Sequence, residues 1–424
     1  MTYGLMTHLP MMRRLFPATL ALLAALAAPA CAQAQAGAPE ALEAAQQALY
    51  QDALLALSEG RRTDASRALQ RLIEQEPRHA GAWLDLALIQ CSLGNADEAE
   101  RLFATIETRF EPSRGILELI SQTREEGCRP WTPSSSLALT FGRGIDHNVN
   151  QGASTSTLKL GDGSLELPLL DDFLPKRDDY TVAGVEYLRD LTPNGTIGFA
   201  QLQSRRNDAL RNYDTDSLFG GIESPWRFGK WVLRSTLVAG TVTLGGHSYQ
   251  RQAQGQLRVT PPLSLPSNTV FNLMAGHTWT NYRRLANFDA RTMELRPELS
   301  YRRSSVYASA SLGLLNDHGD AQRPGGNRHG QLLNLLVRAA LPGGLTGEAG
   351  YTRQTWRSAR PYAPELLIPQ TRDQATQVLR GTLTYPINKN HSLVFDARAV
   401  RNRENIEIFQ YNNRQFQLSW RWQP

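Results

Sequence analysis

The chain has 424 residues, a length that allows two domains of ordinary size. Its formal net charge is only +5, which argues against the clustered basic surface that nucleic-acid-binding proteins present. Beyond the N-terminus no apolar run reaches the ~18–20 residues that a membrane-spanning helix needs. Insertion into a membrane would therefore have to use strands.

Residues 1–36 have the pattern of a secretory signal peptide. Arg13 and Arg14 form its basic region, Leu15–Ala28 its apolar region, and the small residues around Cys31 or Gln35 its cleavage site. Lipoprotein processing at Cys31 is the less favoured alternative, because no leucine stands three residues before it. Removal of the two arginines leaves 43 basic and 40 acidic residues, a net charge of +3.

Cleavage would leave two cysteines, Cys91 and Cys128, in an oxidising compartment. They either form a disulfide or remain as two buried free thiols.

Residues 37–130 are rich in Ala, Leu, Glu and Gln, with apolar positions at helical spacing. The pattern recurs after 34 residues, since Gly60 precedes Gly94, and Ala65 precedes Ala99, by that distance. This resembles the tetratricopeptide repeat, in which small residues let paired helices pack closely and a glycine makes the turn between them. The packing positions of the second unit are occupied by Trp83, Leu86, Gly94, Ala99 and Phe103, with Ala87 in place of the usual glycine.

Two such units cannot bury a continuous core by themselves. We therefore expect a capping helix over Gly115–Glu126 and support from the neighbouring domain. The module either binds a partner protein in a groove or acts as a spacer, and its residues do not specify a ligand.

Pro130 and Pro133 mark the boundary at which residues 131–424 begin. This part of the chain is dominated by alternating runs of about 10–14 residues. The last run shows the pattern best: Phe416, Leu418 and Trp420 alternate with glutamine, serine and arginine. A soluble sheet would turn the apolar side chains towards a core, whereas a membrane barrel turns them outwards to lipid. Strands of this length match a tilted membrane crossing and exceed the ~5–6 residues of an ordinary soluble strand.

The sequence predicts fourteen strands and thus an antiparallel transmembrane barrel. Their expected positions are 135–145, 179–189, 195–206, 213–223, 231–244, 248–260, 269–281, 289–302, 305–315, 329–340, 345–357, 373–385, 391–402 and 409–422. With both ends of the barrel on the periplasmic side, every connection longer than ten residues falls on the external side. Segment 146–178 is the longest of them, and it is either an external loop, which a short hairpin could occupy, or a plug folded into the lumen.

Several charged residues occupy the positions expected to face the lumen, namely Arg258, Glu294, Arg296, Glu298, Asp396 and Arg398. Such charges either line a passage or form ion pairs that stiffen the wall. No metal-binding H-E-x-x-H or C-x-x-C is present, and the histidines are scattered. We therefore expect no enzymatic activity, no metal and no cofactor.

Residues 142–150 read Gly-Arg-Gly-Ile-Asp-His-Asn-Val-Asn. This segment resembles the opening of the barrel in the surface lipoprotein assembly modifier family, where a glycine-rich first strand runs into an Asp-x-Asn-Val-Asn element. The matching positions are Gly142, Gly144, Asp146, Asn148 and Asn150. The order of parts is also similar, with a signal peptide, a short tetratricopeptide module and a barrel.

The resemblance implies an outer-membrane protein that brings client lipoproteins, or in some members secreted proteins, to the cell surface. The helical module would meet the client in the periplasm. Outer-membrane lipid, the barrel-assembly machinery and periplasmic chaperones would be further partners, and nucleic acid would not. A channel or polysaccharide-export pore with a helical scaffold, and a structural or adhesive barrel, are the alternatives.

Overall fold

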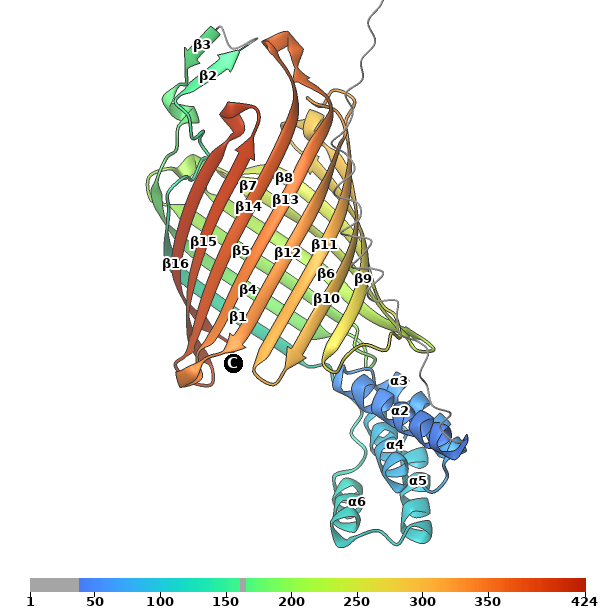
Figure 1. The fold of residues 1–424 in the computed structure, drawn as a ribbon. Coiled ribbons are helices and arrows are strands. Elements are labelled where there is room, and N and C mark those ends of the chain that lie inside the picture. The colour runs from blue at the N-terminus through green and yellow to red at the C-terminus, as the bar shows by residue number, and fades with distance from the viewer. Residues whose placement is uncertain (1–37, 161–164) are drawn as a thin grey trace, which may run out of the picture.

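The computed structural model describes residues 38–160 and 165–424 of the chain. Five helices form one part and a closed barrel of fourteen antiparallel strands forms the other (Figure 1). This confirms the predicted fold class. The predicted signal peptide, residues 1–36, lies outside the described residues.

The helical module consists of two antiparallel pairs and one further helix. The helices are α2 (Ala38–Ser58), α3 (Arg62–Gln75), α4 (Ala80–Ser92), α5 (Ala96–Arg109) and α6 (Arg114–Glu126). Gly60 and Gly94 make equivalent turns within the two pairs, with φ of +75° and +85° that L side chains rarely adopt. Ala65, Ala87 and Ala99 are fully buried between the helices, so the small residues of the repeat allow the close packing.

The barrel strands follow one another around the wall, and β1 closes the circle between β16 and β4. Their bounds are β1 Ser135–Asp146, β4 Asp178–Asp190, β5 Ile197–Asn207, β6 Thr215–Phe228, β7 Trp231–Leu244, β8 His247–Thr260, β9 Thr269–Tyr282, β10 Ala290–Arg303, β11 Val306–Gly319, β12 Arg328–Ala340, β13 Thr346–Ala363, β14 Ile368–Pro386, β15 His391–Glu404 and β16 Tyr411–Trp422.

The outer surface of the barrel is apolar over its middle. In β10, Met293, Leu295 and Leu299 point outwards and are 52%, 46% and 49% exposed, while Glu294 and Arg296 between them face the lumen and are half-buried. β16 has the same arrangement. A soluble barrel would bury its leucines inside, so this inverted alternation is that of a barrel surrounded by lipid.

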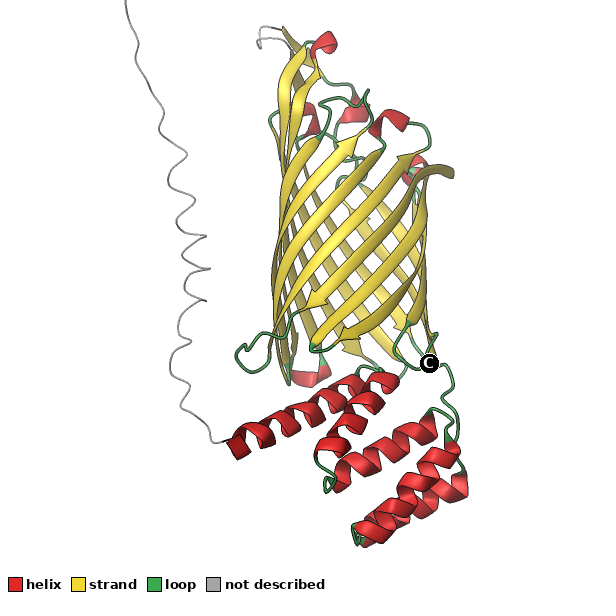
Figure 2. Cartoon of the chain, turned by 90° about the vertical axis from the view of Figure 1, so that its right-hand side faces the viewer, coloured by secondary structure: helices red, strands yellow, loops and turns green. Residues whose placement is uncertain are grey.

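The two ends of the barrel differ. The module lies at the end with the short turns, and the longer connections lie at the opposite end (Figures 1 and 2). Between β1 and β4 the chain forms a separate hairpin of β2 (Thr157–Leu160) and β3 (Leu165–Pro168), which stands beyond the strand ends (Figure 1). None of the described helices is long and apolar enough to cross a membrane.

Candidate functional site

The Asp-x-Asn-Val-Asn element lies where the first and last barrel strands meet. Asp146 ends β1 on the lumen side and is 2% exposed. Its Oδ2 accepts hydrogen bonds from Arg205 Nη2 and Gln415 Nε2, each at 2.7 Å, and its Oδ1 accepts one from the backbone N–H of Asn148 at 3.0 Å. One carboxylate therefore joins β1, β5 and β16.

The two asparagines hold the loop that follows. The Asn148 amide donates to the carbonyls of Gly152 and Asn412, both at 2.9 Å, and its Oδ1 accepts from the N–H of Gly152. Asn150 donates to the carbonyl of Leu174 at 2.8 Å and accepts from the N–H of Lys176 at 2.9 Å. The hydrogen bonds of this element thus fix both ends of the long loop to the barrel.

Gly142 and Gly144 face the lumen on β1, where a side chain does not fit. A Cβ on Gly142 would come 2.7 Å from the carbonyl oxygen of Leu418, and one on Gly144 the same distance from that of Phe416. The space above β1 is used by its neighbours, because Tyr180 of β4 donates a hydrogen bond to Gln417 of β16 at 3.1 Å.

An ion pair crosses β1 in the same way nearer the module. Arg421 of β16 lies 2.6 Å from Glu186 of β4. The hydrogen-bonded register of β1 with β16 begins only at Leu139, whereas with β4 it begins at Ser135. Side chains that reach over β1 therefore supplement a short strand pairing, and we call this region the seam.

The predicted lumen-lining residues all lie on the inner face of the barrel and divide into two groups. Arg296, Glu298, Asp396 and Arg398 line one cavity of about 690 Å³ that also touches β5. Arg258 and Glu294 lie outside that cavity.

Three of the predicted charges have close partners. Asp396 forms a 2.6 Å ion pair with Arg380, and Glu294 lies 3.3 Å from Arg296. These contacts favour stiffening of the wall for these side chains.

A charged cluster at the end of the barrel remote from the module was missed by the sequence analysis. Asp317 is fully buried and accepts from Arg323 at 2.8 Å and from Arg328 at 2.6 Å. Arg328 also lies over the ring of Trp356, 4.5 Å from its centroid. Arg323 belongs to the connection between β11 and β12, so the cluster fixes this connection to the barrel wall.

The helical module is fixed to the barrel at the turn between α2 and α3. Arg61 in this turn is fully buried and bonds Glu59 at 2.6 Å and Asp64 at 3.0 Å. The turn forms a β-bridge between Arg61 and Asn194 of the β4–β5 turn. Gly195 next to it has φ of +80°, and a Cβ there would lie 3.1 Å from the carbonyl oxygen of Glu59.

Opposite charges complete this contact. Arg227 of β6 lies 2.6 Å from Asp52 of α2, and Arg234 of β7 lies 3.7 Å from Glu59. The acidic end of the first helical pair therefore faces a basic end of the barrel wall.

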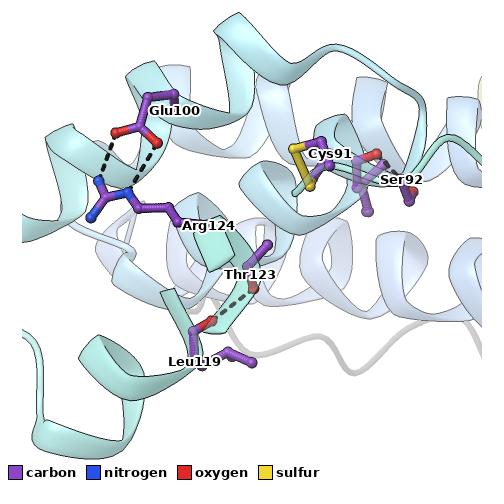
Figure 3. Close-up of a disulfide and its surroundings, with 8 residues drawn as sticks. Cys91, Ser92, Glu100, Leu119, Thr123 and Arg124 are labelled. Atoms are coloured by element: carbon purple, nitrogen blue, oxygen red, sulfur yellow. Dashed lines mark hydrogen bonds and ion pairs between the residues drawn. A yellow bond between two sulfur atoms is a disulfide. The ribbon is translucent and has the colours of Figure 1, made fainter. Parts of the chain in front are cut away.

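In the second pair, Leu86, Ala99 and Phe103 are buried in the module's core and Trp83 packs against it. A disulfide joins Cys91 at the end of α4 to Cys128 after α6 (Figure 3). Arg124 of α6 is held by Glu100 and Glu107 of α5, each at 2.7 Å. Its hydrogen bond lowers the pKa of the Glu107 carboxyl below its usual value.

Residues 56–112 match the family model of the tetratricopeptide repeat. No curated protein sequence matches the chain.

Among solved structures, the chain is similar to OmpT, an outer membrane protein of Vibrio cholerae, with 6% identity, a TM-score of 0.38, and coverage of 69% of this chain and 98% of that one. It is also similar to the outer membrane channel DcaP of Acinetobacter baumannii, at 11% identity and a TM-score of 0.38, covering 69% and 97% of the two chains. A third is an anion-selective porin from Comamonas acidovorans, at 12% identity and a TM-score of 0.36, covering 69% and 100%. Likeness of this degree carries no argument about what this barrel does.

Proposed function

We propose that this chain is an outer-membrane translocation factor that displays or exports specific client proteins at the cell surface. The observation that carries the proposal is the fixed position of the repeat module at the short-turn end of the barrel. Arg61, Gly195 and the Arg227–Asp52 pair hold the module there. A module that recruits a client from the periplasm needs to present it to the barrel mouth, and this attachment would do so.

The resemblance of residues 142–150 to the surface lipoprotein assembly modifier family is the basis for the class of client that we propose. Clients would be surface lipoproteins or secreted proteins, which the module would bind before they reach the barrel. The buried position of Asp146 and Asn148 supports a structural role for this element, which holds the seam and the long loop in place. We assign no catalytic group, metal or cofactor to the site.

The test is surface exposure of candidate clients in a bacterial host that lacks this protein. Each client is co-expressed with the protein, and intact cells are then shaved with protease or labelled with antibody. We expect one client to appear outside only when the protein is present. Removal of residues 38–126, and separately the Arg61→Ala substitution, should abolish or reduce its display, while Arg67→Ala on the exposed side of α3 should not.

A different result would refute the proposal. If the protein resides correctly in the outer membrane and no client moves, the export function is wrong. Single-channel conductance of the purified protein would then test the channel alternative, and binding by the external loops would test the adhesive one.

A further inference from the structure

The outward face of the barrel carries different side chains at its two ends. At the end that bears the module, this face is aromatic. The outward aromatic residues there include Trp226, Phe228, Trp231, Tyr301, Tyr385 and Trp420. At the opposite end arginines occupy outward positions on five strands, and the exposed Trp279 lies beside one of them, Arg291. These exposed arginines are Arg251, Arg291, Arg353, Arg357, Arg401, Arg403 and Arg414.

The change from apolar side chains to arginine occurs at a definite height. In β15 the outward positions run from Leu393 to Ala399 without a charge, and Arg401 and Arg403 follow. The uncharged part covers about 20 Å along the strand at ~3.3 Å per residue. The apolar band of membrane barrels is ~25 Å tall. Barrel strands are tilted by ~35–45°, so this run rises less than its length. Arg401 is the first charge at the end of the run remote from the module, and a long arginine side chain extends from there to the lipid headgroups.

Several arginines of the lumen have protein partners, although Arg258 has a buried Nε without one among the described residues. Arg380, Arg338 and Arg421 each lie 2.6 Å from a carboxylate. On the outward face, Arg143 and Arg206 pair with Asp208 and Asp216.

The seven outward arginines of the end remote from the module differ from these residues in having no partner in the part of the chain that the structure describes. Within residues 38–160 and 165–424, none of their guanidinium groups has an ion-pair partner or donates a hydrogen bond. Ion pairing inside the barrel therefore does not account for their presence.

Four of these arginines form a compact group. The strand register places Arg353 of β13, Gln377 of β14, Arg401 of β15 and Asn412 of β16 in one row. Arg403 lies one outward position above this row and Arg414 one below it. Neighbouring strands are ~4.8 Å apart, so Arg353 and Arg401 stand roughly 10 Å from each other. We call Arg353, Arg401, Arg403 and Arg414 the arginine patch.

We propose that the arginine patch binds the phosphate groups of a multiply phosphorylated glycolipid in the outer leaflet of the membrane. This inference rests on the orientation in the proposed function, with the module on the periplasmic side. Guanidinium groups bind phosphate through two parallel hydrogen bonds. Several phosphates on one headgroup engage neighbouring arginines together, and the second contact is then intramolecular. A phospholipid with a single phosphate lacks this advantage.

The test measures lipid binding to the purified full-length protein in detergent by native mass spectrometry. The probes are lipid A with two phosphates, lipid A with one phosphate, and phosphatidylglycerol. We expect the doubly phosphorylated lipid A to bind at least tenfold more tightly than phosphatidylglycerol. The triple variant Arg401→Gln/Arg403→Gln/Arg414→Gln should lose that preference, and the corresponding Arg→Lys variant should keep part of it.

A matched control removes the same number of positive charges from the other end of the barrel. Arg189, Lys230 and Arg303 are exposed there, and their replacement by glutamine should leave lipid binding unchanged. Equal loss in both triple variants would overturn the proposal, as would equal binding of phosphatidylglycerol and doubly phosphorylated lipid A. If the triple glutamine variant does not fold, the single variant Arg401→Gln should still weaken binding, and an unchanged affinity would refute the patch.

These measurements need no client. Lipid binding without any client display would refute the proposed function and leave this inference standing. Client display without preferential lipid A binding would refute this inference and leave the proposed function standing.

Discussion

Asp146 is the single residue on which the seam depends most. Its carboxylate joins three strands through Arg205, Gln415 and the backbone of Asn148. Loss of the charge in Asp146→Asn leaves the partly buried Arg205 without its counter-charge. We expect the free energy of barrel unfolding to fall by about 2 kcal/mol, as for other hydrogen bonds to buried charged groups.

The measurement is the urea midpoint of barrel unfolding, followed by tryptophan fluorescence in detergent. The control is Asp208→Asn, which removes the partner of Arg143 in a pair that is about half exposed. Solvent screens an exposed pair, so its loss should lower the stability much less. Equal effects of the two substitutions would contradict the role given to Asp146.

Tyr50 gives the helical module a pH dependence of its own. It donates a hydrogen bond to Asp85 at 2.8 Å, and burial followed by this bond raises the pKa of its phenol to about 12. Because the pKa is raised above its ordinary value of 10.0, the neutral phenol stabilises the folded module. This stability is fully present below pH 10 and is lost as the pH rises through about 12.

Residues 38–126 contain no lysine and no other tyrosine, so the pH effect on this module is attributable to Tyr50. We expect the thermal midpoint of the helical signal at 222 nm to fall between pH 10 and pH 12. In Tyr50→Phe the same fall should be absent, while the midpoint at pH 8 should drop slightly for the lost hydrogen bond. A fall of the same size in both proteins would show that another group titrates.

At the level of elements, the α2–α3 turn determines how the module is held. Arg61 is fully buried and bonds two carboxylates of its own turn. Arg61→Ala would leave Glu59 and Asp64 without their shared cation. The turn would lose its rigid shape and hold its backbone bridge to Asn194 less firmly. We expect the distance between spin labels at Gln122 of α6 and Asn388 of the β14–β15 turn to change from a narrow to a broad distribution.

Double electron–electron resonance on the full chain measures that distance. Arg67→Ala is the control on α3. The Arg67 side chain is 69% exposed, and its distance of 4.0 Å from Asp64 makes the ion pair a weak one. A narrow distribution in Arg61→Ala would show that the module is held by other contacts.

The whole molecule has a defined orientation if it works as proposed. A tag inserted between Arg283 and Arg284, in the connection between β9 and β10, should be labelled on intact cells. A tag between Gly343 and Gly344, in the short turn between β12 and β13, should be labelled only after the outer membrane is permeabilised. Labelling of both tags on intact cells would contradict a periplasmic module.

Alternation predicted the fourteen strands because it reflects contact with two different surroundings, lipid and lumen, along most of each strand. It failed where those surroundings end. β13 runs to Ala363 and β14 begins at Ile368, well beyond the predicted 357 and 373. The extra part contains Pro361 and shifts of register, and prolines of this kind indicate a loop when only the sequence is read.

Contacts between distant segments could not be predicted for a different reason. Nothing in the sequence pairs Asp146 with Arg205, or Arg61 with Asn194, because local periodicity carries no information on which strands and turns meet. The glycines of the seam were visible as a motif. Their function, to let Tyr180 and Gln417 meet above β1, follows only from the closed barrel.

The disulfide between Cys91 and Cys128 determines how a mechanical load would travel through the molecule. It joins the end of α4 to a point seven residues before β1, and the N–H of Trp131 bonds the carbonyl of Ser92 at 2.7 Å. A pull on the first three helices, α2 to α4, therefore reaches β1, one edge of the seam, without stretching α5 and α6. After reduction of the bond, the covalent path from α4 to β1 would include the chain between the two cysteines, which are 37 residues apart. The redox state of this bond thus changes how directly tension on α4 reaches the strand that closes the barrel.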